Sequence, residues 1–107
     1  MKMQSISPET IYRGNYAWEK SLPQITKLTK SPLILGRSNQ TKNLRNKIFI
    51  DLKNHNLSVN SSDLQFDCCY EDITRVKEII LKKNHDSVIA AGGGKVLDSG
   101  KYIAECL

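Results

Sequence analysis

The stretch that decides the fold of this chain is SVIAAGGGKVLDSGK, which covers residues 87–101. Its apolar start, residues 87–91, is short and continuous and predicts a buried strand of a parallel sheet. Three glycines follow at 92–94, and the spacing of residues 96–106 then predicts a helix with Leu97, Ile103 and Ala104 facing inward. The stretch therefore predicts a strand, a glycine-rich turn and a helix in direct succession.

The rest of the chain repeats this alternation of strand-like and helix-like segments. Apolar runs predict strands at residues 10–14, 31–36 and around 64–66, and helical spacing predicts helices at 16–28, 41–54 and 71–83. Pro23 either opens a second segment of the first helix or lies in its first turn, where the missing N–H does no harm. The second helix carries one apolar stripe, formed by Leu44, Ile48, Phe49 and Leu52.

Strands that alternate with helices are typical of a parallel sheet. The connections are short, and no repeat, low-complexity segment or internal boundary interrupts the 107 residues. We therefore expect a single α/β domain over residues 1–107. Its predicted architecture is a Rossmann-like parallel sheet with helices on both faces, in three layers.

Charge and hydropathy exclude several classes of partner. The formal net charge is +5, but the 16 basic residues are scattered, which is typical of solvated helix faces rather than of a nucleic-acid surface. A small ligand that carries phosphate would suit the same positive excess. The chain has no apolar run long enough to span a membrane, and its polar start lacks the apolar core of a signal peptide. We therefore expect no nucleic-acid or membrane partner and a cytoplasmic location.

The cysteines and histidines do not form the pattern of a metal site. Cys68, Cys69 and Cys106 are odd in number, which argues against a disulfide framework, and the adjacent pair lacks the spacing of zinc ligands. We expect buried or half-buried thiols. His55 and His85 stand in asparagine-flanked segments that are typical of turns. No metal-ligating residue is assigned.

The glycine-rich turn is the candidate binding site. A turn between a parallel strand and the next helix lies at the carboxyl edge of the sheet, where ligands of α/β proteins bind. The helix start offers N–H groups and partial positive charge to an anion. Gly92, Gly93 and Gly94 would let backbone amides approach a diphosphate, and Lys95 would add a full charge. The spacing matches neither the dinucleotide fingerprint nor the phosphate loop, so a tight turn without a ligand is the alternative.

Asp98 and Lys101 follow on the same helix. Their spacing of three residues puts them on one face. They could pair as a surface salt bridge, or they could line a cleft just beyond the phosphates.

The segment GGGKVLDSGK resembles the GGG-[KS]-x-x-D-x-x-K signature of the iron-containing alcohol dehydrogenases, and its Lys95 form is most similar to the glycerol dehydrogenase branch. Residues 6–25, 31–59 and 70–95 resemble the strands and helices that lead to this signature, so the resemblance covers nearly the whole chain. It implies that Gly92, Gly93, Gly94 and Lys95 hold the pyrophosphate of NAD or NADP. It also implies that Asp98 and Lys101 face the nicotinamide end and the substrate cleft.

The chain departs from that family at the end of the second expected strand. Members that prefer NAD usually carry an acidic residue there, which accepts hydrogen bonds from the adenosine ribose. In this chain Gly36, Arg37 and Ser38 occupy the position, and none of them has a carboxylate. Arg37 could pair with a 2′-phosphate, which favours NADP, or it could be an ordinary exposed loop arginine.

The resemblance also implies a helical domain and metal ligands that residues 1–107 do not supply. Family members are much longer, and a helical C-terminal domain provides the ligands of a divalent metal, Fe or Zn. We therefore expect residues 1–107 to be the N-terminal NAD(P)-binding domain alone, with unknown catalytic residues and no activity by itself. A surface normally covered by the helical domain would favour a homodimer or a higher oligomer.

The function implied by the resemblance is that of a metal-dependent polyol or alcohol dehydrogenase. Such an enzyme oxidises a hydroxyl group of a small molecule by hydride transfer to NAD or NADP. One alternative is the NAD-binding domain of a cyclase resembling dehydroquinate synthase. Another is a non-catalytic module that binds a nucleotide or a protein.

Overall fold

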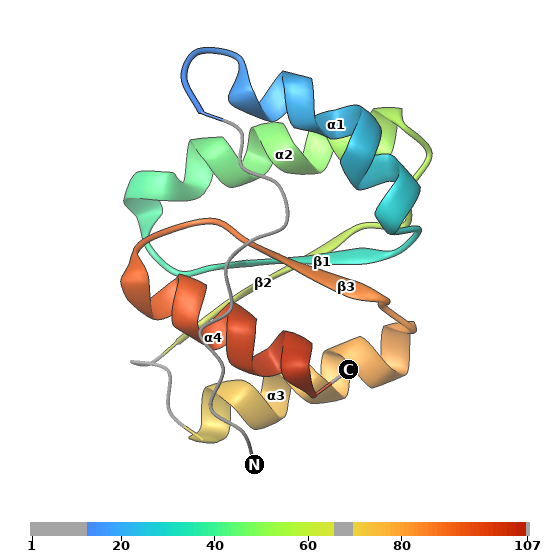
Figure 1. Ribbon diagram of the computed structural model, residues 1–107. Helices are drawn as coiled ribbons and strands as arrows, with labels where there is room; N and C mark the ends of the chain where they lie inside the picture. Colours follow the sequence, from blue (N-terminus) through green and yellow to red (C-terminus); the bar gives the residue numbers. More distant parts are fainter. Residues whose placement is uncertain (1–12, 66–69, 107) are drawn as a thin grey trace, which may run out of the picture.

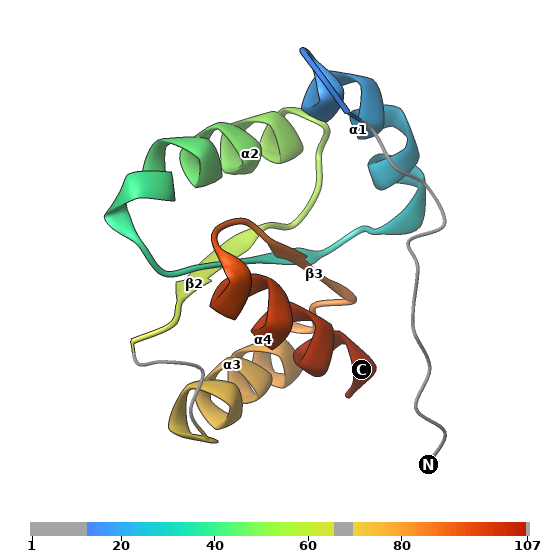
Figure 2. The same cartoon turned by 60° about the vertical axis from the view of Figure 1, so that its left-hand side comes forward.

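The computed structural model describes residues 13–65 and 70–106 of the chain. In chain order its elements are α1 (Ala17–Leu28), β1 (Pro32–Gly36), the 3₁₀ turn η1 (Asn39–Thr41), α2 (Lys42–Asn54), β2 (Asn60–Asp63), α3 (Tyr70–Lys83), β3 (Ser87–Ala90) and α4 (Gly94–Glu105). The three strands form a parallel sheet in the order β2-β1-β3. Both views of the chain show α1 and α2 on one face of the sheet and α3 and α4 on the other (Figures 1 and 2). The expected three-layer α/β fold is confirmed.

The central strand β1 supplies side chains to both cores. Leu33, Ile34 and Leu35 are fully buried. Successive side chains along a strand point to opposite faces of the sheet. Ile34 therefore belongs to the cluster under α1 and α2, whereas Leu33 and Leu35 belong to the cluster over α3 and α4. A strand buried on both faces needs a continuous apolar run, which explains why this element is readable in the sequence.

The strand expected around residues 64–66 lies earlier, at Asn60–Asp63. β2 is an edge strand, and only Ser62 of its residues is buried. The apolar residues that fill the core on either side, Val59 and Leu64, lie just outside it. The residues of β2 are polar, so they do not have the apolar pattern of a strand. The apolar residues that suggested a strand flank β2 instead. Phe66 and residues 10–12 lie outside the described residues, and Arg13 and Gly14 form no strand.

Helix α1 runs without a break through Pro23, so both expectations for this proline are wrong. Pro23 lies in the interior of the helix, beyond the first turn, and its missing N–H removes one helical hydrogen bond. Its side chain is exposed, whereas the adjacent Leu22 is 8% exposed and packs in the core. Burial of the Leu22 face keeps the helix continuous where the local preference would end it.

Helix α4 begins at Gly94, and of the three residues expected to face inward only Ile103 does so. The buried residues are Val96, Ser99, Gly100 and Ile103, whereas Leu97 is 44% exposed and Ala104 is exposed. A Cβ atom at position 100 would lie 2.7 Å from the Cβ of Ala90 in β3. The small residues at 99 and 100 therefore let α4 approach the strand closely, and Leu97 is turned outward.

Of the three cysteines, only Cys106 lies among the described residues. Cys68 and Cys69 lie outside the described residues. Cys106, at the end of α4, is exposed, so the expectation of a buried or half-buried thiol is wrong at this position. The exposure arises because the inward face of α4 ends at Ile103.

The amino edge of the sheet is held together by the carboxylate of Asp86. It accepts hydrogen bonds from the backbone N–H groups of Lys30 at 2.9 Å and Ser31 at 3.2 Å, and from the hydroxyl of Thr29. These contacts join the start of β3 to the start of β1. Burial opposes the charge of Asp86, but the hydrogen bonds outweigh it and hold the pKa of this carboxyl below its ordinary value.

Stability at acid pH should depend on Asp86. Because its pKa is lower in the folded state than the unfolded value of about 3.9, it stabilises the fold above that pH, and this stabilisation is lost as the pH falls through the folded pKa. In the Asp86→Asn variant the free energy of unfolding should be lower at neutral pH and should fall less steeply on acidification. Urea unfolding at a series of pH values measures this, with Asp98→Asn as the exposed control. Parallel curves for wild type and Asp86→Asn would contradict the assignment.

Candidate functional site

A cavity lies at the carboxyl edge of the sheet, between the ends of β1 and β3. These strands are parallel neighbours, so their carboxyl ends meet although the sequence separates them widely. The cavity has a volume of about 190 Å³ and is lined by Arg37, Ser38, Gly93, Gly94, Lys95 and Val96. It therefore unites the glycine-rich turn with the loop after β1, the two segments singled out in the sequence.

One wall of the cavity is the start of helix α4. Gly93 is the N-cap residue, its backbone is extended with φ −80° and ψ −171°, and no side chain caps the helix. The first N–H groups of an α-helix have no carbonyl partner within the helix, and the helix dipole places partial positive charge there. This wall is chemically suited to bind an anion.

The three glycines of the turn have different roles. A Cβ atom at Gly92 would meet the side chain of Val96 at 3.0 to 3.2 Å, so packing accounts for this glycine. A Cβ atom at Gly93 or Gly94 would have no heavy atom within 4 Å. Neither of these two has a positive φ angle, so neither backbone strain nor crowding requires glycine there. The space in front of both residues is therefore open, and packing does not account for either glycine.

The opposite wall is the loop that follows β1. Arg37 and Ser38 are exposed and line the cavity, whereas Gly36 is buried and does not. The Ser38 hydroxyl accepts a hydrogen bond of 3.1 Å from the backbone N–H of Gln40 and so caps η1. The structure thus brings two of the three predicted residues of this segment to the cavity, and Gly36 lies behind them.

Asp98 and Lys101 do not line the cavity. Both are exposed and lie on the side of α4 that faces away from the sheet. They share a helix face as expected, but the ion pairs of residues 13–65 and 70–106 do not include one between them. Their place near the nicotinamide end of a cofactor stays a prediction.

Arg45, a buried cation behind the loop, is a residue of this region that the sequence did not predict. Its exposed fraction is 4%, and its guanidinium donates to the Ser38 carbonyl at 3.1 Å and to the Thr41 hydroxyl. Arg45, Ile48 and Leu52 have the helical spacing of an inward face, and all three are buried. The expected stripe instead included Leu44, which is 47% exposed, because only apolar residues were considered for that face.

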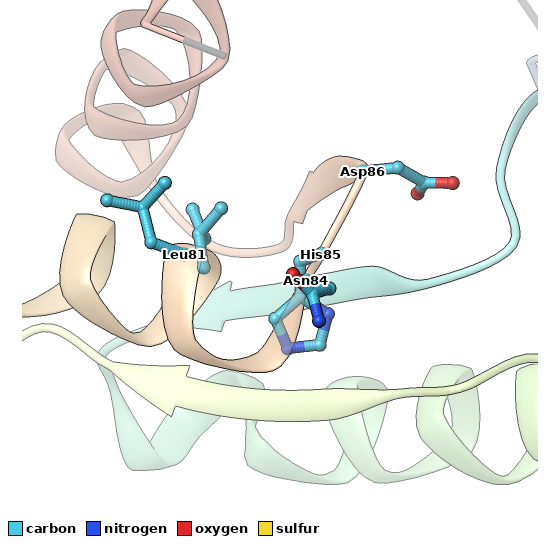
Figure 3. A pocket seen from close by; sticks show the side chains of 5 residues that line it. Leu81, Asn84, His85 and Asp86 are labelled. Carbon is cyan, nitrogen blue, oxygen red and sulfur yellow. The ribbon is translucent and has the colours of Figure 1, made fainter.

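A second hollow of about 390 Å³ lies at the amino edge, where α3 leads into β3. Figure 3 shows that the Asp86 carboxylate points away from Leu81 and Asn84, so the polar groups around this hollow do not converge. Asp86 already binds the start of β1, and His85 Nδ1 lies 3.0 Å from the Ser31 carbonyl oxygen. We therefore take the cavity at the carboxyl edge as the candidate site.

The described part of the chain contains no set of side chains that could bind a metal ion. Among residues 13–65 and 70–106 there is no group of three or more His, Cys, Asp or Glu side chains that could hold a metal ion. Nor does any described helix have the length and apolar character needed to cross a membrane. At the carboxyl edge, Arg37 and Lys95 line the cavity beside the start of α4.

The family model of the iron-containing alcohol dehydrogenases matches residues 8–107. The chain belongs to the iron-containing alcohol dehydrogenase family. The match includes both segments that line the cavity. No curated protein matches the chain significantly.

Solved structures of alcohol dehydrogenases have the same fold. Glycerol dehydrogenase from Schizosaccharomyces pombe is similar with a TM-score of 0.71 and 26% identity, over 85% of this chain and 23% of that one. A probable glycerol dehydrogenase from Sinorhizobium meliloti matches with a TM-score of 0.56 and 25% identity, over 80% and 22%. NADH-dependent butanol dehydrogenase A from Thermotoga maritima matches with a TM-score of 0.67 and 21% identity, over 78% and 23%, which shows the fold alone. The chain thus spans less than a quarter of the length of these dehydrogenases.

Proposed function

We propose that residues 1–107 are the NAD(P)-binding domain of a metal-dependent polyol or alcohol dehydrogenase that resembles glycerol dehydrogenase. The observation that carries this proposal is the open start of α4, where Gly93 and Gly94 leave the helix N–H groups accessible beside Lys95. The names of the similar structures, two glycerol dehydrogenases and an NADH-dependent butanol dehydrogenase, support it.

In this proposal the pyrophosphate of the cofactor lies against Gly93, Gly94 and the first turn of α4. The helix N–H groups and Lys95 neutralise its charge. Gly92 supports this wall by packing against Val96. When bound, the nicotinamide group would accept a hydride from the alcohol carbon. The described residues contribute binding and orientation, and catalytic residues are not assigned among them.

The family resemblance also implies a divalent metal, Fe or Zn. Because the described residues contain no suitable ligand group, we derive no step through a metal ion. The substrate class, a small alcohol or polyol, follows from the names of the similar dehydrogenases. A homodimeric or higher assembly and a cytoplasmic location stay predictions, as does the lack of activity of these residues alone.

We further propose that the domain prefers NADP to NAD. Arg37 and Ser38 line the cavity at the end of β1, and neither offers a carboxylate to the ribose hydroxyls. A guanidinium can form two charge-assisted hydrogen bonds with a 2′-phosphate. The preference therefore depends on Arg37, whereas the pyrophosphate contacts at α4 are common to both cofactors.

Titration of the purified protein with NADPH and with NADH, followed by nicotinamide fluorescence, tests both proposals. NADPH should bind at least about tenfold more tightly, because one charge-assisted hydrogen bond contributes roughly 1.5–3 kcal/mol. Arg37→Ala should remove most of this difference and leave the affinity for NADH unchanged. Lys82→Ala, which removes an exposed cation at the end of α3, is the matched control. Tighter binding of NADH would refute the NADP preference, and binding of neither cofactor would refute the whole proposal.

A further inference from the structure

Arg45 occupies an unusual position for a charged residue. It extends from α2 to the carboxyl end of β1, and its side chain is 95% buried. Three groups hold the guanidinium: the Ser38 carbonyl at 3.1 Å, the Thr41 hydroxyl, and the Asp63 carboxylate, whose Oδ1 lies 3.6 Å from Nε. A buried guanidinium with such partners stabilises one arrangement of the groups around it.

The guanidinium also fills the space above Gly36. A Cβ atom at position 36 would overlap the Cδ, Nε and Cζ atoms of Arg45. Any side chain at 36 would therefore displace the guanidinium from the Ser38 carbonyl, the Thr41 hydroxyl and Asp63. Arg45 thus explains why this position is glycine, since the φ angle of Gly36 does not require it.

The partners of Arg45 decide what it can contribute to binding. Asp63 lies beside it and balances its charge, so Arg45 adds little net charge to the cavity. The bonds to Ser38 and Thr41 instead join α2 to both ends of η1, since Ser38 is its N-cap and Thr41 its last residue. The contribution of Arg45 is therefore geometrical: it fixes the loop from which Arg37 and Ser38 reach the cavity.

We propose that Arg45 is a positioning residue that sets the cofactor specificity of this domain. By holding the Ser38 carbonyl and the Thr41 hydroxyl, it keeps Arg37 and Ser38 at the cavity for the 2′-phosphate of an adenosine. By filling the space above Gly36, it excludes an acidic side chain that would accept hydrogen bonds from an unphosphorylated ribose. The inference rests on the proposed function, because it concerns the same cavity and the same class of ligand.

The specificity ratio is the property that tests this role. In Arg45→Met, which keeps much of the apolar stem in the buried site, we expect the affinity for NADPH to fall about tenfold or more, as for a lost charge-assisted contact. The affinity for NADH and for 5′-ADP, which carries the diphosphate without the 2′-phosphate, should change by less than about threefold. Arg45→Lys should rescue part of the loss, because an ammonium group can keep one of the partners but lacks the fork that reaches all of them. A general loss of structure would lower all three affinities together, so this pattern separates positioning from folding.

A second measurement uses the contact between positions 36 and 45. Gly36→Ala should weaken NADPH binding in the wild-type background and should have almost no further effect in Arg45→Ala, where the space is free. Independent effects of the two substitutions, or an unchanged ratio of NADPH to NADH affinity in Arg45→Met, would overturn the inference while leaving the proposed function intact. If the wild-type protein binds neither dinucleotide, the proposed function fails and the inference falls with it. If Arg45→Met does not fold, an unchanged ratio in Gly36→Ala overturns the inference.

Discussion

The Gly93→Val variant is expected to lose at least about 90% of its affinity for NADP and NAD while keeping its fold. The backbone of Gly93 is extended, a conformation that valine adopts without strain, and a Cβ atom there meets no heavy atom within 4 Å. The two valine methyl groups would instead enter the cavity in front of the α4 start. A diphosphate could then no longer approach the helix N–H groups, and losing even one charge-assisted hydrogen bond costs roughly 1.5–3 kcal/mol.

The control for this variant is Ala104→Val, which adds the same two methyl groups at an exposed position near the other end of α4. Dinucleotide affinity is measured by fluorescence titration, and folding by the far-UV circular dichroism and the urea midpoint. Stability of Gly93→Val should fall by at most about 1 kcal/mol, because valine is a poorer N-cap than glycine. Wild-type affinity in the folded variant would show that the glycine serves the turn alone.

The Gly100→Val variant should have the opposite profile, with a large loss of stability. Gly100 lies on the inward face of α4, and a Cβ atom there would be 2.7 Å from the Cβ of Ala90 and 3.9 Å from Cγ1 of Val88. The helix would have to move away from β3, and overpacking of a core typically costs 1–3 kcal/mol. For a domain of this size, whose total stability is about 5–15 kcal/mol, this is a substantial fraction.

Urea denaturation followed by circular dichroism measures this effect. Gly94→Ala is the matched control, because its added Cβ meets nothing within 4 Å and its helix propensity rises. We expect a lower midpoint for Gly100→Val and an unchanged or higher one for Gly94→Ala. An unchanged midpoint in Gly100→Val would mean that α4 and β3 do not pack as closely as the structure describes.

The signature segment thus contains glycines with separate physical roles. A Cβ atom would clash with Ala90 at Gly100 and would pack tightly against Val96 at Gly92, whereas Gly93 and Gly94 leave space open at the cavity. In the sequence all four lie within residues 92–101, and the family resemblance assigns phosphate binding to the first three together. The structure separates them because the role of a glycine depends on what a Cβ atom would touch.

The elements that could be predicted are those whose burial follows a regular pattern along the segment, as in β1 and α3. The apolar run of β1 and the helical spacing of α3 identified both elements almost to the residue. The position of β2 was wrong because an edge strand needs few apolar residues, and its polar side chains resemble a loop. The prediction for Pro23 was wrong for a related reason. Packing of Leu22 in the core outweighs the local preference of proline against a helix interior.

The sequence by itself determined the class of the fold, the family and the glycine-rich start of α4, because these depend on residue types at short, regular spacing. Only the tertiary structure decided that Arg37 and Ser38 share a cavity with Gly93 and Gly94. It also decided that Asp98 and Lys101 lie outside that cavity, and that Arg45 fills the space above Gly36. The physical reason is that these contacts join β1, α2 and α4 through the pairing of parallel strands, and no local pattern of apolar or charged residues records such a contact.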